Sequence, residues 1–402
     1  MNTEDLMEGF FYNRGMPYMI LRGSEHPQTA TVEGLNQLDQ SNCLKTEFQH
    51  ETIGENIMGF DYGPSMGGVI ESILFRMYTN GERIISMSAF PRFKERVINI
   101  SGEPLDIALM KMERFNGFHS AAYSTMFCRA IEQSLKIKTA QSTRMTRVIM
   151  MEMERIASHI FVITRLCEAA SQNIAAFHMN ALRERMLRLS ARAFGHRYFF
   201  GINSVGGTAR EIHIDHLWED VRKIVNEFND ILKLLSGSRI FTDRIQKTCT
   251  IERPWLSGPA LRATGEKYDS RLFDSYYDGI KFNVVSEKGS DSLARFLVRA
   301  QEITESGKII EQALNLIETP KPVIESNSER SGNFLDRVET PSGNAIFYLE
   351  IENGNIQYTY LRPPSLVNME GFLLGMQGNV KTDFPFAYES FGIWVSELSV
   401  IS

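Results

Sequence analysis

One segment of this 402-residue sequence gathers side chains that could move protons. It is Glu113–Ser120, which contains an acid at Glu113 and an imidazole at His119, and Tyr123 follows closely. His119 is the best candidate for a charge change near neutral pH, because only imidazole has an ordinary pKa in that range. The alternative is a histidine at a helix start that hydrogen-bonds the backbone. We expect Glu113 and Glu397 to relay protons if both line one cavity.

Two further sets of charged residues have a helical spacing. Glu152, Arg155 and His159 lie at i, i+3 and i+7, so they share one helix face, where polar residues are usually paired or solvated. Their alternative role is proton movement. A basic run follows at Arg183, Arg185, Arg188, Arg192 and Arg197. We expect it to pair with acids of a neighbouring helix or subunit, and binding of phosphate or anionic lipid is the alternative.

The cysteines give no local metal site. Cys43, Cys128, Cys167 and Cys249 are far apart, and none belongs to a CxxC or CxxH pair. We expect reduced thiols that pack as small hydrophobic side chains. Gly63–Gly68 and the other glycine-rich pieces match neither GxGxxG nor GxxxxGK[ST], so the sequence gives no sign that the chain binds NAD.

Composition excludes several classes of protein. With 43% hydrophobic and 23% charged residues, the chain is typical of globular proteins rather than disordered or fibrous ones. A formal net charge of −6 argues against nucleic-acid binding through bulk charge. The acidic N-terminal stretch does not resemble a signal peptide, and no uninterrupted apolar run approaches the roughly 20 residues of a membrane span.

The elements that must position these groups follow the order strands, helices, strands. The first third predicts strands at Tyr18–Arg22, Thr29–Val32, Val69–Tyr78 and Arg83–Ser88. Asn80-Gly81 between the last two predicts a hairpin, and Asn353-Gly354 predicts a second one between Ala345–Glu350 and Ile356–Leu361. The centre, from about Leu105 to Leu235, is helical. Further helices are predicted at about Ser292–Ile317 and Val367–Met376.

Apolar stripes support the helices. Steps of three and four residues connect Ile149, Met153, Ile156, Ile160 and Ile163, and likewise Leu217, Val221, Ile224, Phe228, Ile231 and Leu235. We therefore predict an α+β fold, a central helix bundle flanked by small antiparallel sheets from both chain ends. The expected regions are β-rich residues 1–100, a helical core at 101–330 with a long loop at 241–291, and a hairpin and tail at 331–402 that pack back on the core.

Eight collinear motifs carry a resemblance to a known family. Besides Glu113–Ser120 and a helix ending in Ala130-Ile131-Glu132, they are Met153–His159, Phe194–Arg197, Gly258–Gly265, Arg295–Glu302, Arg337–Gly343 and Arg362–Ser365. From about Gly63 onward the chain resembles the large subunit of membrane-bound, energy-converting [NiFe] hydrogenases and the homologous 49-kDa-type subunit of respiratory complex I. This resemblance implies a hydrogenase-large-subunit-like fold.

The resemblance also shows which groups have been replaced. In the hydrogenases, the segment matching Glu113–Ser120 is ERxCGxCS, and its cysteines correspond to Asn116 and His119 here. The C-terminal DPCxxC motif has its cysteines at Trp394 and Glu397. A Ni–Fe centre needs soft, bridging thiolates, which these four side chains do not supply. We expect the four positions to face one another across one buried hollow that binds no metal.

Quinone chemistry meets a similar difficulty. In the complex I relatives, a histidine of a GPxHP hairpin and a nearby tyrosine contact the quinone. The histidine position here is Met66, and the tyrosine position falls at or beside Gly117, so neither residue has a side-chain hydrogen-bond donor. His119 and Tyr123 are close enough in sequence to act as substitutes.

The resemblance implies a subunit of a membrane-associated, ion-translocating complex. The preferred hypothesis is a metal-free scaffold that binds no cofactor itself and lies beside a small subunit carrying a [4Fe-4S] cluster. Other implied partners are proton-channel-like and antiporter-like membrane subunits and a hydrophilic accessory subunit, and the implied location is the cytoplasmic face of the membrane. One alternative is catalytic reduction of quinone or another two-electron acceptor, with His119, Tyr123 and Glu113 as candidate residues. A hydrogenase with unusual ligands is the third hypothesis.

Overall fold

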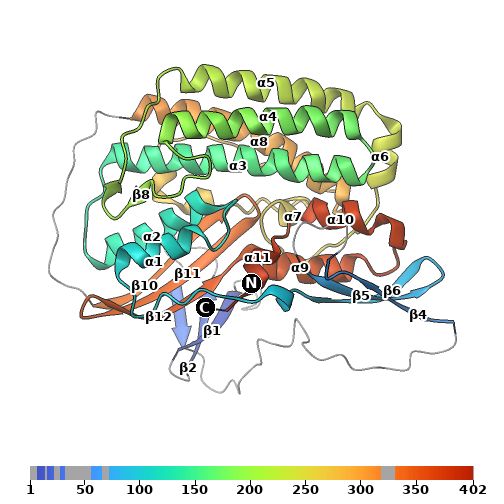
Figure 1. Ribbon diagram of the computed structural model, residues 1–402, viewed down its shortest axis with the longest axis horizontal. Helices are drawn as coiled ribbons and strands as arrows, with labels where there is room; N and C mark the ends of the chain where they lie inside the picture. Colours follow the sequence, from blue (N-terminus) through green and yellow to red (C-terminus); the bar gives the residue numbers. More distant parts are fainter. Residues whose placement is uncertain are drawn as a thin grey trace.

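Figure 1 shows the computed structural model of the chain, which describes residues 7–13, 16–21, 28–31, 56–65, 72–317 and 331–401. For residues 7–13, 16–21, 28–31 and 400–401 the backbone alone is described. Met66 and Cys43, both named above, lie outside the described residues.

The longer helices lie in the upper part of the molecule in Figure 1, and several shorter helices lie lower, beside the sheets. The helices of the described residues are α1 (Leu105–Glu113), α2 (Ser120–Ser134), α3 (Gln141–Ala169), α4 (Asn173–Phe194), α5 (Leu217–Ser236), α6 (Arg239–Ile245), α7 (Gly258–Arg262), α8 (Ser292–Leu316), α9 (Pro364–Gly375), α10 (Phe384–Phe391) and α11 (Val395–Leu398). Short 3₁₀ turns occur at Arg92–Lys94, Ser270–Phe273, Ser275–Tyr277 and Lys381–Asp383. Helices α3, α4, α5 and α8 lie nearly side by side, and α3 packs against both α4 and α8.

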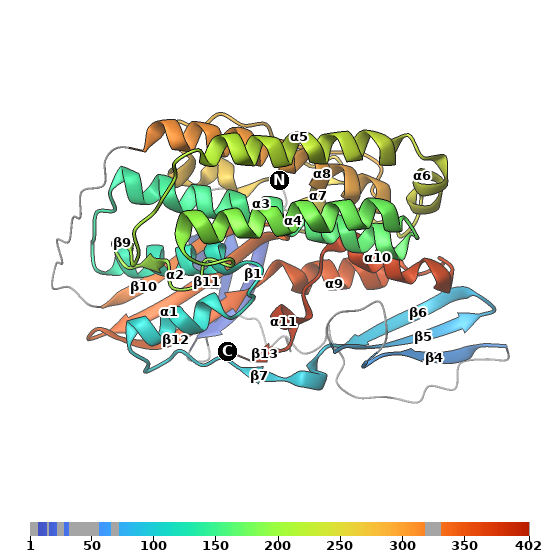
Figure 2. The ribbon, with the colours of Figure 1, turned by 45° about the horizontal axis from the view of Figure 1, so that its top comes forward.

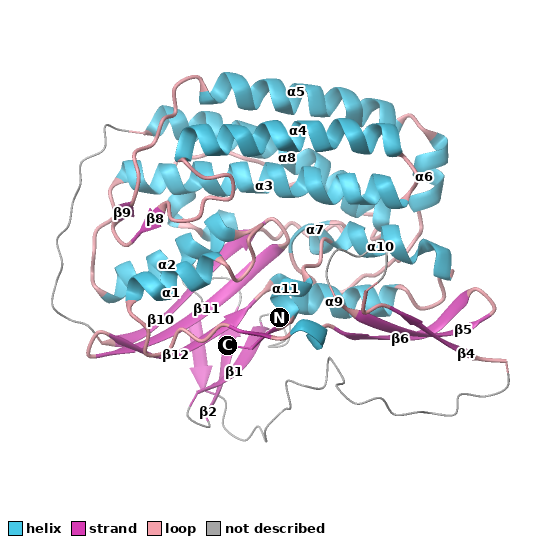
Figure 3. Cartoon of the chain, viewed as in Figure 1, coloured by secondary structure: helices cyan, strands magenta, loops and turns pink. Residues whose placement is uncertain are grey.

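The strands form small sheets below the bundle (Figure 3). They are β1 (Met7–Asn13), β2 (Met16–Leu21), β3 (Gln28–Thr31), β4 (Met58–Tyr62), β5 (Leu74–Asn80), β6 (Arg83–Phe90), β7 (Arg96–Val97), β8 (Asn203–Ser204), β9 (Gly207–Thr208), β10 (Gly332–Thr340), β11 (Gly343–Glu352), β12 (Asn355–Arg362) and β13 (Val400–Ile401). In the described part of the chain, three antiparallel sheets of three strands each have the orders β1-β2-β3, β4-β5-β6 and β10-β11-β12. The short strands β8 and β9 pair antiparallel, and β7 and β13 pair parallel. Figure 2, which turns the molecule by 45°, shows the β4–β6 sheet below helices α9 and α10.

The predicted α+β class is confirmed, because helices and small antiparallel sheets from both chain ends occur in the predicted order. The apolar stripe of α3 is buried along its whole length, and helices α4, α8 and α10 pack around it. The stripe of α5 is buried at five positions and half-buried at Ile231, as expected of a helix on the outer face.

Both predicted hairpins are present. In the second, Asn353 and Gly354 have φ values of 52° and 80°, and Glu352 pairs with Asn355, which is the geometry of a two-residue turn with both central residues left-handed. In the first, Asn80 pairs with Arg83, so the loop consists of Gly81 and Glu82, one residue later than predicted.

Two predicted regions contain elements that the sequence did not indicate. The loop expected at 241–291 begins inside α6, and its remainder is interrupted by α7 and two 3₁₀ turns. The C-terminal hairpin has a third strand, β10, which pairs with β11. This strand lacks the apolar alternation of a half-buried strand, because Asp336, Arg337 and Glu339 are buried in it through ion pairs and hydrogen bonds.

Two hydrophobic cores lie on either side of the segments that build the candidate site. The larger lies among the helices of the bundle and the β10–β12 sheet, and it includes Phe115 and Tyr123. The smaller lies between the β4–β6 sheet and helices α7, α9 and α10, and it includes Ile393 and Val395. The chain segments that carry these four residues are joined by a hydrogen bond from Tyr123 to Glu397.

The basic run on and just after α4 pairs with acids, and the expected pairing with a neighbouring helix is observed for Arg185 and Arg192 only, because Glu184 belongs to α4 itself. Arg185 contacts Glu227 of α5, Arg192 contacts Asp220, and both Arg188 and Arg197 contact Glu184. Arg183 differs from the others, because its guanidinium lies 4.5 Å from the centre of the Phe161 ring.

Candidate functional site

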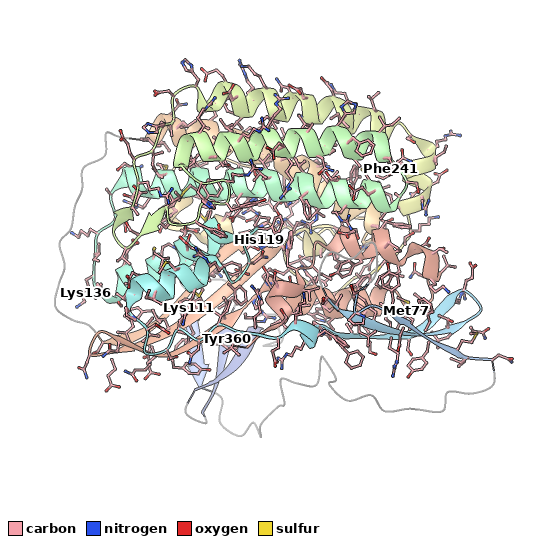
Figure 4. The ribbon with its side chains drawn as sticks, in the orientation of Figure 1. Met77, Lys111, His119, Lys136, Phe241 and Tyr360 are labelled. Atoms are coloured by element: carbon pink, nitrogen blue, oxygen red, sulfur yellow. The ribbon has the colours of Figure 1, made fainter. Side chains whose placement is uncertain are left out.

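The candidate site is built by two segments that are far apart in the sequence. The turn between α1 and α2 supplies Asn116 and His119, and the C-terminal segment around α11 supplies Trp394 and Glu397. Arg96 joins them by donating hydrogen bonds to the carbonyl groups of Phe115 and Ser396, at 3.0 and 3.2 Å. Figure 4 shows His119 near the middle of the molecule, between the bundle and the sheets.

The carboxylate of Glu397 is the common acceptor of the site. Its Oε1 atom accepts hydrogen bonds from Asn116 Nδ2 at 2.8 Å, His119 Nδ1 at 3.0 Å and the Tyr123 hydroxyl at 2.8 Å. Its Oε2 atom accepts one from the Ser365 hydroxyl at 2.6 Å. All five side chains are buried. The predicted convergence is therefore observed, but these groups touch directly instead of facing one another across a hollow.

The protonation states follow from burial and these hydrogen bonds. Burial alone would raise the pKa of Glu397, but the hydrogen bonds from His119, Ser365 and Asn116 outweigh it and lower the pKa below its ordinary value. Burial lowers the pKa of His119, and Arg155 and Arg299 lower it further against the opposing effect of Glu397. The pair is thus an ionised carboxylate and a neutral imidazole that donates from Nδ1.

Tyr123 belongs to the same cluster. Burial, and next the charge of Glu397, raise the pKa of its phenol well above the ordinary value. The hydroxyl therefore stays protonated and donates a hydrogen bond to Glu397. Of the residues predicted to act in the site, His119 and Tyr123 are brought together on one carboxylate.

Glu113 is not part of this cluster. Its Oε1 atom accepts a hydrogen bond from the backbone N–H of Gly201 at 2.9 Å, and its Oε2 atom lies 3.5 Å from Arg114. Burial raises its pKa. The structure does not join Glu113 and Glu397 into one hydrogen-bonded set, so the proton relay expected between them has no direct connection here. Gly117 lies beside the site, and a Cβ there would be 3.3 Å from the Phe200 ring.

Stacked aromatic rings fix Trp394. The rings of Trp394 and Phe118 are 4.4 Å apart at 22°, and Phe161 stacks on both, at 5.1 Å from Phe118 and 5.8 Å from Trp394. His119 meets the indole edge-on at 5.5 Å. Phe161 and Ser365 had no assigned role in the sequence, because only the fold brings α3 and the start of α9 to this place.

A left-handed glycine and an arginine hold the C-terminal segment. Gly392 ends α10 with φ of 61°, and a Cβ there would lie 2.5 Å from the guanidinium of Arg299. Arg299 donates hydrogen bonds to the carbonyl groups of Phe391 and Pro341, and the Ser342 hydroxyl donates to the Gly392 carbonyl. The turn between β10 and β11 therefore sets the position of Trp394 and Glu397.

The polar face of α3 lies in a buried ionic network, not in solvent. Glu152 binds Arg155 and Arg271, and His159 donates to Glu302. Burial lowers the pKa of His159 to about 3, so this imidazole is neutral. The pairing expected for this face is observed, and it ties α3 to α8 and to the 3₁₀ turn at Ser270–Phe273.

The donor set of the site does not fit a thiolate-bridged metal centre. The four positions hold an amide, an imidazole, an indole and a carboxylate, and the imidazole Nδ1 is already bound to Glu397. Among the described residues, no group of three or more His, Cys, Asp or Glu side chains is arranged to hold a metal ion. The structure places Cys128, Cys167 and Cys249 in the hydrophobic cores instead.

These three thiols are expected to be unreactive in the folded chain. Burial raises the pKa of Cys128 and Cys167 to about 12 and that of Cys249 to about 11, so thiolate is scarce at neutral pH. In a Cys43→Ser variant, a chromogenic disulfide reagent should label well under one thiol per chain without denaturant and three in guanidinium chloride. Rapid labelling of the folded variant would contradict their placement.

This fold has a counterpart among the solved structures of respiratory membrane complexes. A chain of the membrane-bound sulfane sulfur reductase, an archaeal respiratory membrane complex, has the same fold, with a TM-score of 0.80 and 21% identity over 87% of this chain and 100% of that chain. Residues 172–331 match the family model of the 49-kDa subunit of respiratory-chain NADH dehydrogenase.

Curated relatives agree with this match. A chloroplast NAD(P)H-quinone oxidoreductase subunit of Lepidium virginicum is 31% identical over 61% of this chain and 74% of its own length. An NADH-quinone oxidoreductase subunit of Herpetosiphon aurantiacus is 29% identical over 81% of this chain and 91% of its own. The chain belongs to the family of the 49-kDa subunit of respiratory-chain NADH dehydrogenase, as its motifs predicted. No helix in the described part of the chain is both long and apolar enough to cross a membrane.

Proposed function

We propose that this chain is a metal-free subunit of a membrane-associated, ion-translocating respiratory complex, with a hydrogenase-large-subunit-like fold and a mainly structural role. Its neighbours would be a small subunit carrying a [4Fe-4S] cluster, proton-channel-like and antiporter-like membrane subunits, and a hydrophilic accessory subunit. The chain would lie on the cytoplasmic face of the membrane and bind no cofactor itself. Membership of the 49-kDa family supports the kind of assembly.

One observation carries the structural role. The carboxylate of Glu397 accepts four hydrogen bonds, from Asn116, His119, Tyr123 and Ser365, so the positions that match the hydrogenase thiolates are held together by one buried acceptor. A buried carboxylate with four donors is costly to open. The site therefore fixes the C-terminal segment against the start of α2, which is consistent with a structural role.

Purification of the complex tests this role. An affinity-tagged chain expressed with its neighbouring genes, and extracted in mild detergent, should carry an iron–sulfur protein and membrane subunits in fixed proportion. A matched variant, Glu397→Ala, should lose these partners together with the fold of the C-terminal segment, whereas an exposed change, Glu311→Ala, should retain them. Recovery of the unaltered chain as a monomer without partners would contradict the proposal.

The second candidate function is reduction of a quinone or another two-electron acceptor. It is favoured by two buried polar atoms of the site, His119 Nε2 and Trp394 Nε1, for which no described residue provides a hydrogen-bond partner. The indole N–H could donate to a quinone carbonyl, and the imidazole nitrogen could accept from the hydroxyl of the quinol. Two electrons from the partner's cluster and two protons would complete the reduction.

Point variants separate the two functions. If the site reduces an acceptor, His119→Ala and Trp394→Phe should each lower turnover at least tenfold in the intact complex, with Trp255→Phe outside the site as the control. If the role is structural, both site variants that assemble should sustain the same electron flow as the unaltered complex. Turnover unchanged in both would exclude the catalytic function.

A further inference from the structure

A small cavity lies beside the site, between α3, α4 and the segment that follows α4. Its volume is about 20 Å³, which is room for about one water molecule. Gly117 and Phe118, which directly precede His119 in the sequence, form part of the cavity wall. The polar residues that line it are Glu154, Ser158, Arg183, Ser190, Arg197 and Tyr198.

Glu154 is the acid in this cavity. Its two carboxyl oxygens accept hydrogen bonds from the backbone N–H groups of Ala121 and Ala122, at 2.7 and 3.1 Å. These are among the N–H groups that the first turn of α2 leaves without partners. Burial raises the pKa of Glu154 to about 8, and the two backbone hydrogen bonds and Arg155 reduce this shift. The acid therefore holds a proton at neutral pH and exchanges it close to that pH.

Ser158 supplies a second, independent observation. It lies one helical turn after Glu154 on α3, only 3% of the residue is exposed, and no described residue accepts or donates a hydrogen bond to its hydroxyl. Ser190 lines the same cavity from α4, but its hydroxyl donates to the Met186 carbonyl at 3.0 Å. A buried hydroxyl without a partner in a cavity of this size calls for a water molecule.

The groups around Glu154 come from every element that packs on it. Arg155 is on α3, Arg183 on α4, Arg197 and Tyr198 follow α4, and Tyr123 is on α2. Arg183 and Arg197 are partly exposed, so the cavity borders solvent on their side. On the inner side, Glu154 binds the residues that directly precede Tyr123, whose hydroxyl donates to Glu397 at 2.8 Å. The cavity thus lies between solvent and the hydrogen-bonded site.

We propose that this cavity binds one exchangeable water held by Ser158 and Glu154, and that Glu154 exchanges a proton with solvent through it next to the His119–Glu397 pair. In the step, the Glu154 O–H bond breaks, the electron pair stays on the carboxylate, and the proton passes to the water to give hydronium, with the reverse on uptake. No electron acceptor is needed, so the inference goes beyond the structural role and does not depend on it.

Infrared titration of the full chain in its complex tests the acid. The carbonyl stretch of a protonated carboxyl group should disappear with a midpoint near pH 8, and this band should be missing in Glu154→Gln. The amide oxygen of glutamine can still accept from the α2 backbone, so this variant should assemble. Glu389 is a second buried acid, its pKa raised by burial to about 7, and Glu389→Gln should leave the band near pH 8 in place. A band unchanged in Glu154→Gln would overturn the proposal.

Two serine variants test the water. After transfer into D₂O, the Glu154 band should exchange about fivefold more slowly in Ser158→Ala than in the unaltered chain, the effect of removing about one hydrogen bond from the water. Ser190→Ala removes a hydroxyl from the same cavity wall that is already bound to Met186, so it should exchange at the original rate. Equal exchange rates in the two variants would show that Ser158 holds no water on the proton path.

Discussion

Replacing Glu397 by alanine is expected to lower the free energy of unfolding by about 3–5 kcal/mol, because each buried donor left unsatisfied costs about 1–3 kcal/mol and partial repacking recovers some of the loss. The variant leaves the side chains of Asn116, His119, Tyr123 and Ser365 as donors without their shared acceptor. Denaturant unfolding monitored by circular dichroism measures this loss. The exposed change Glu311→Ala should alter the same quantity by no more than about 0.5 kcal/mol.

The same carboxylate gives a pH dependence with a definite sign. Because hydrogen bonds lower the pKa of Glu397 in the folded chain, its contribution is complete above the ordinary value of 4.5 and is lost as the pH falls through the folded value. Glu397→Gln has no such titration. The stability difference between the unaltered chain and Glu397→Gln should therefore shrink below about pH 4.5. A constant difference from neutral to strongly acidic pH would mean that the carboxylate is not ionised in the fold.

Replacing Arg262 by methionine is expected to lower the free energy of unfolding by at least as much as Glu397→Ala does. Its guanidinium donates to Glu302 and Glu339, both at 2.8 Å, and lies 3.4 Å from Asp269, and all four side chains are almost fully buried. Methionine fills much of the volume but leaves three acids near one another with less positive charge. Breaking a buried pair in this way costs about 3–5 kcal/mol. We expect little soluble protein at ordinary growth temperature.

A surface arginine provides the matched control. Arg185 contacts Glu227 with both side chains about half exposed, so Arg185→Met should cost no more than about 1 kcal/mol. The loss in Arg262→Met should also be smaller at acidic pH, because protonation neutralises the acids left behind. Equal unfolding free energies for the two variants would contradict the placement of Arg262 at the centre of a buried ionic network.

The parts of the fold that the sequence predicts are those with a local cause. The stripe from Ile149 to Ile163 and the Asn353-Gly354 turn each specify their own element through side-chain spacing or backbone preference. Strand β10 was not predicted, because Arg129 and Arg262, distant in the sequence, neutralise its acids and allow a charged strand to be buried. The burial of β10 arises only when the whole chain has folded, so the sequence of the strand shows no periodic apolar pattern.

The candidate site divides in the same way. The order of motifs predicts that Asn116 and His119 meet Trp394 and Glu397, since a shared fold places matching positions together. The sequence does not predict that the carboxylate of Glu397 accepts hydrogen bonds from four side chains, Ser365 among them. This arrangement depends on how the ends of α2, α9 and α11 lie relative to one another. The role proposed for Glu154 of α3 depends on the hydrogen bonds that it accepts from the backbone at the start of α2, and no residue spacing within α3 predicts that contact.

Metal analysis of the purified complex tests the central claim most directly. The chain is copurified with its partners, and nickel and iron are measured per chain by mass spectrometry. If Asn116, His119 and Trp394 pack around Glu397 with no metal, iron should match the partner's clusters and nickel should be far below one atom per chain. About one nickel per chain, lost in His119→Ala, would contradict the account.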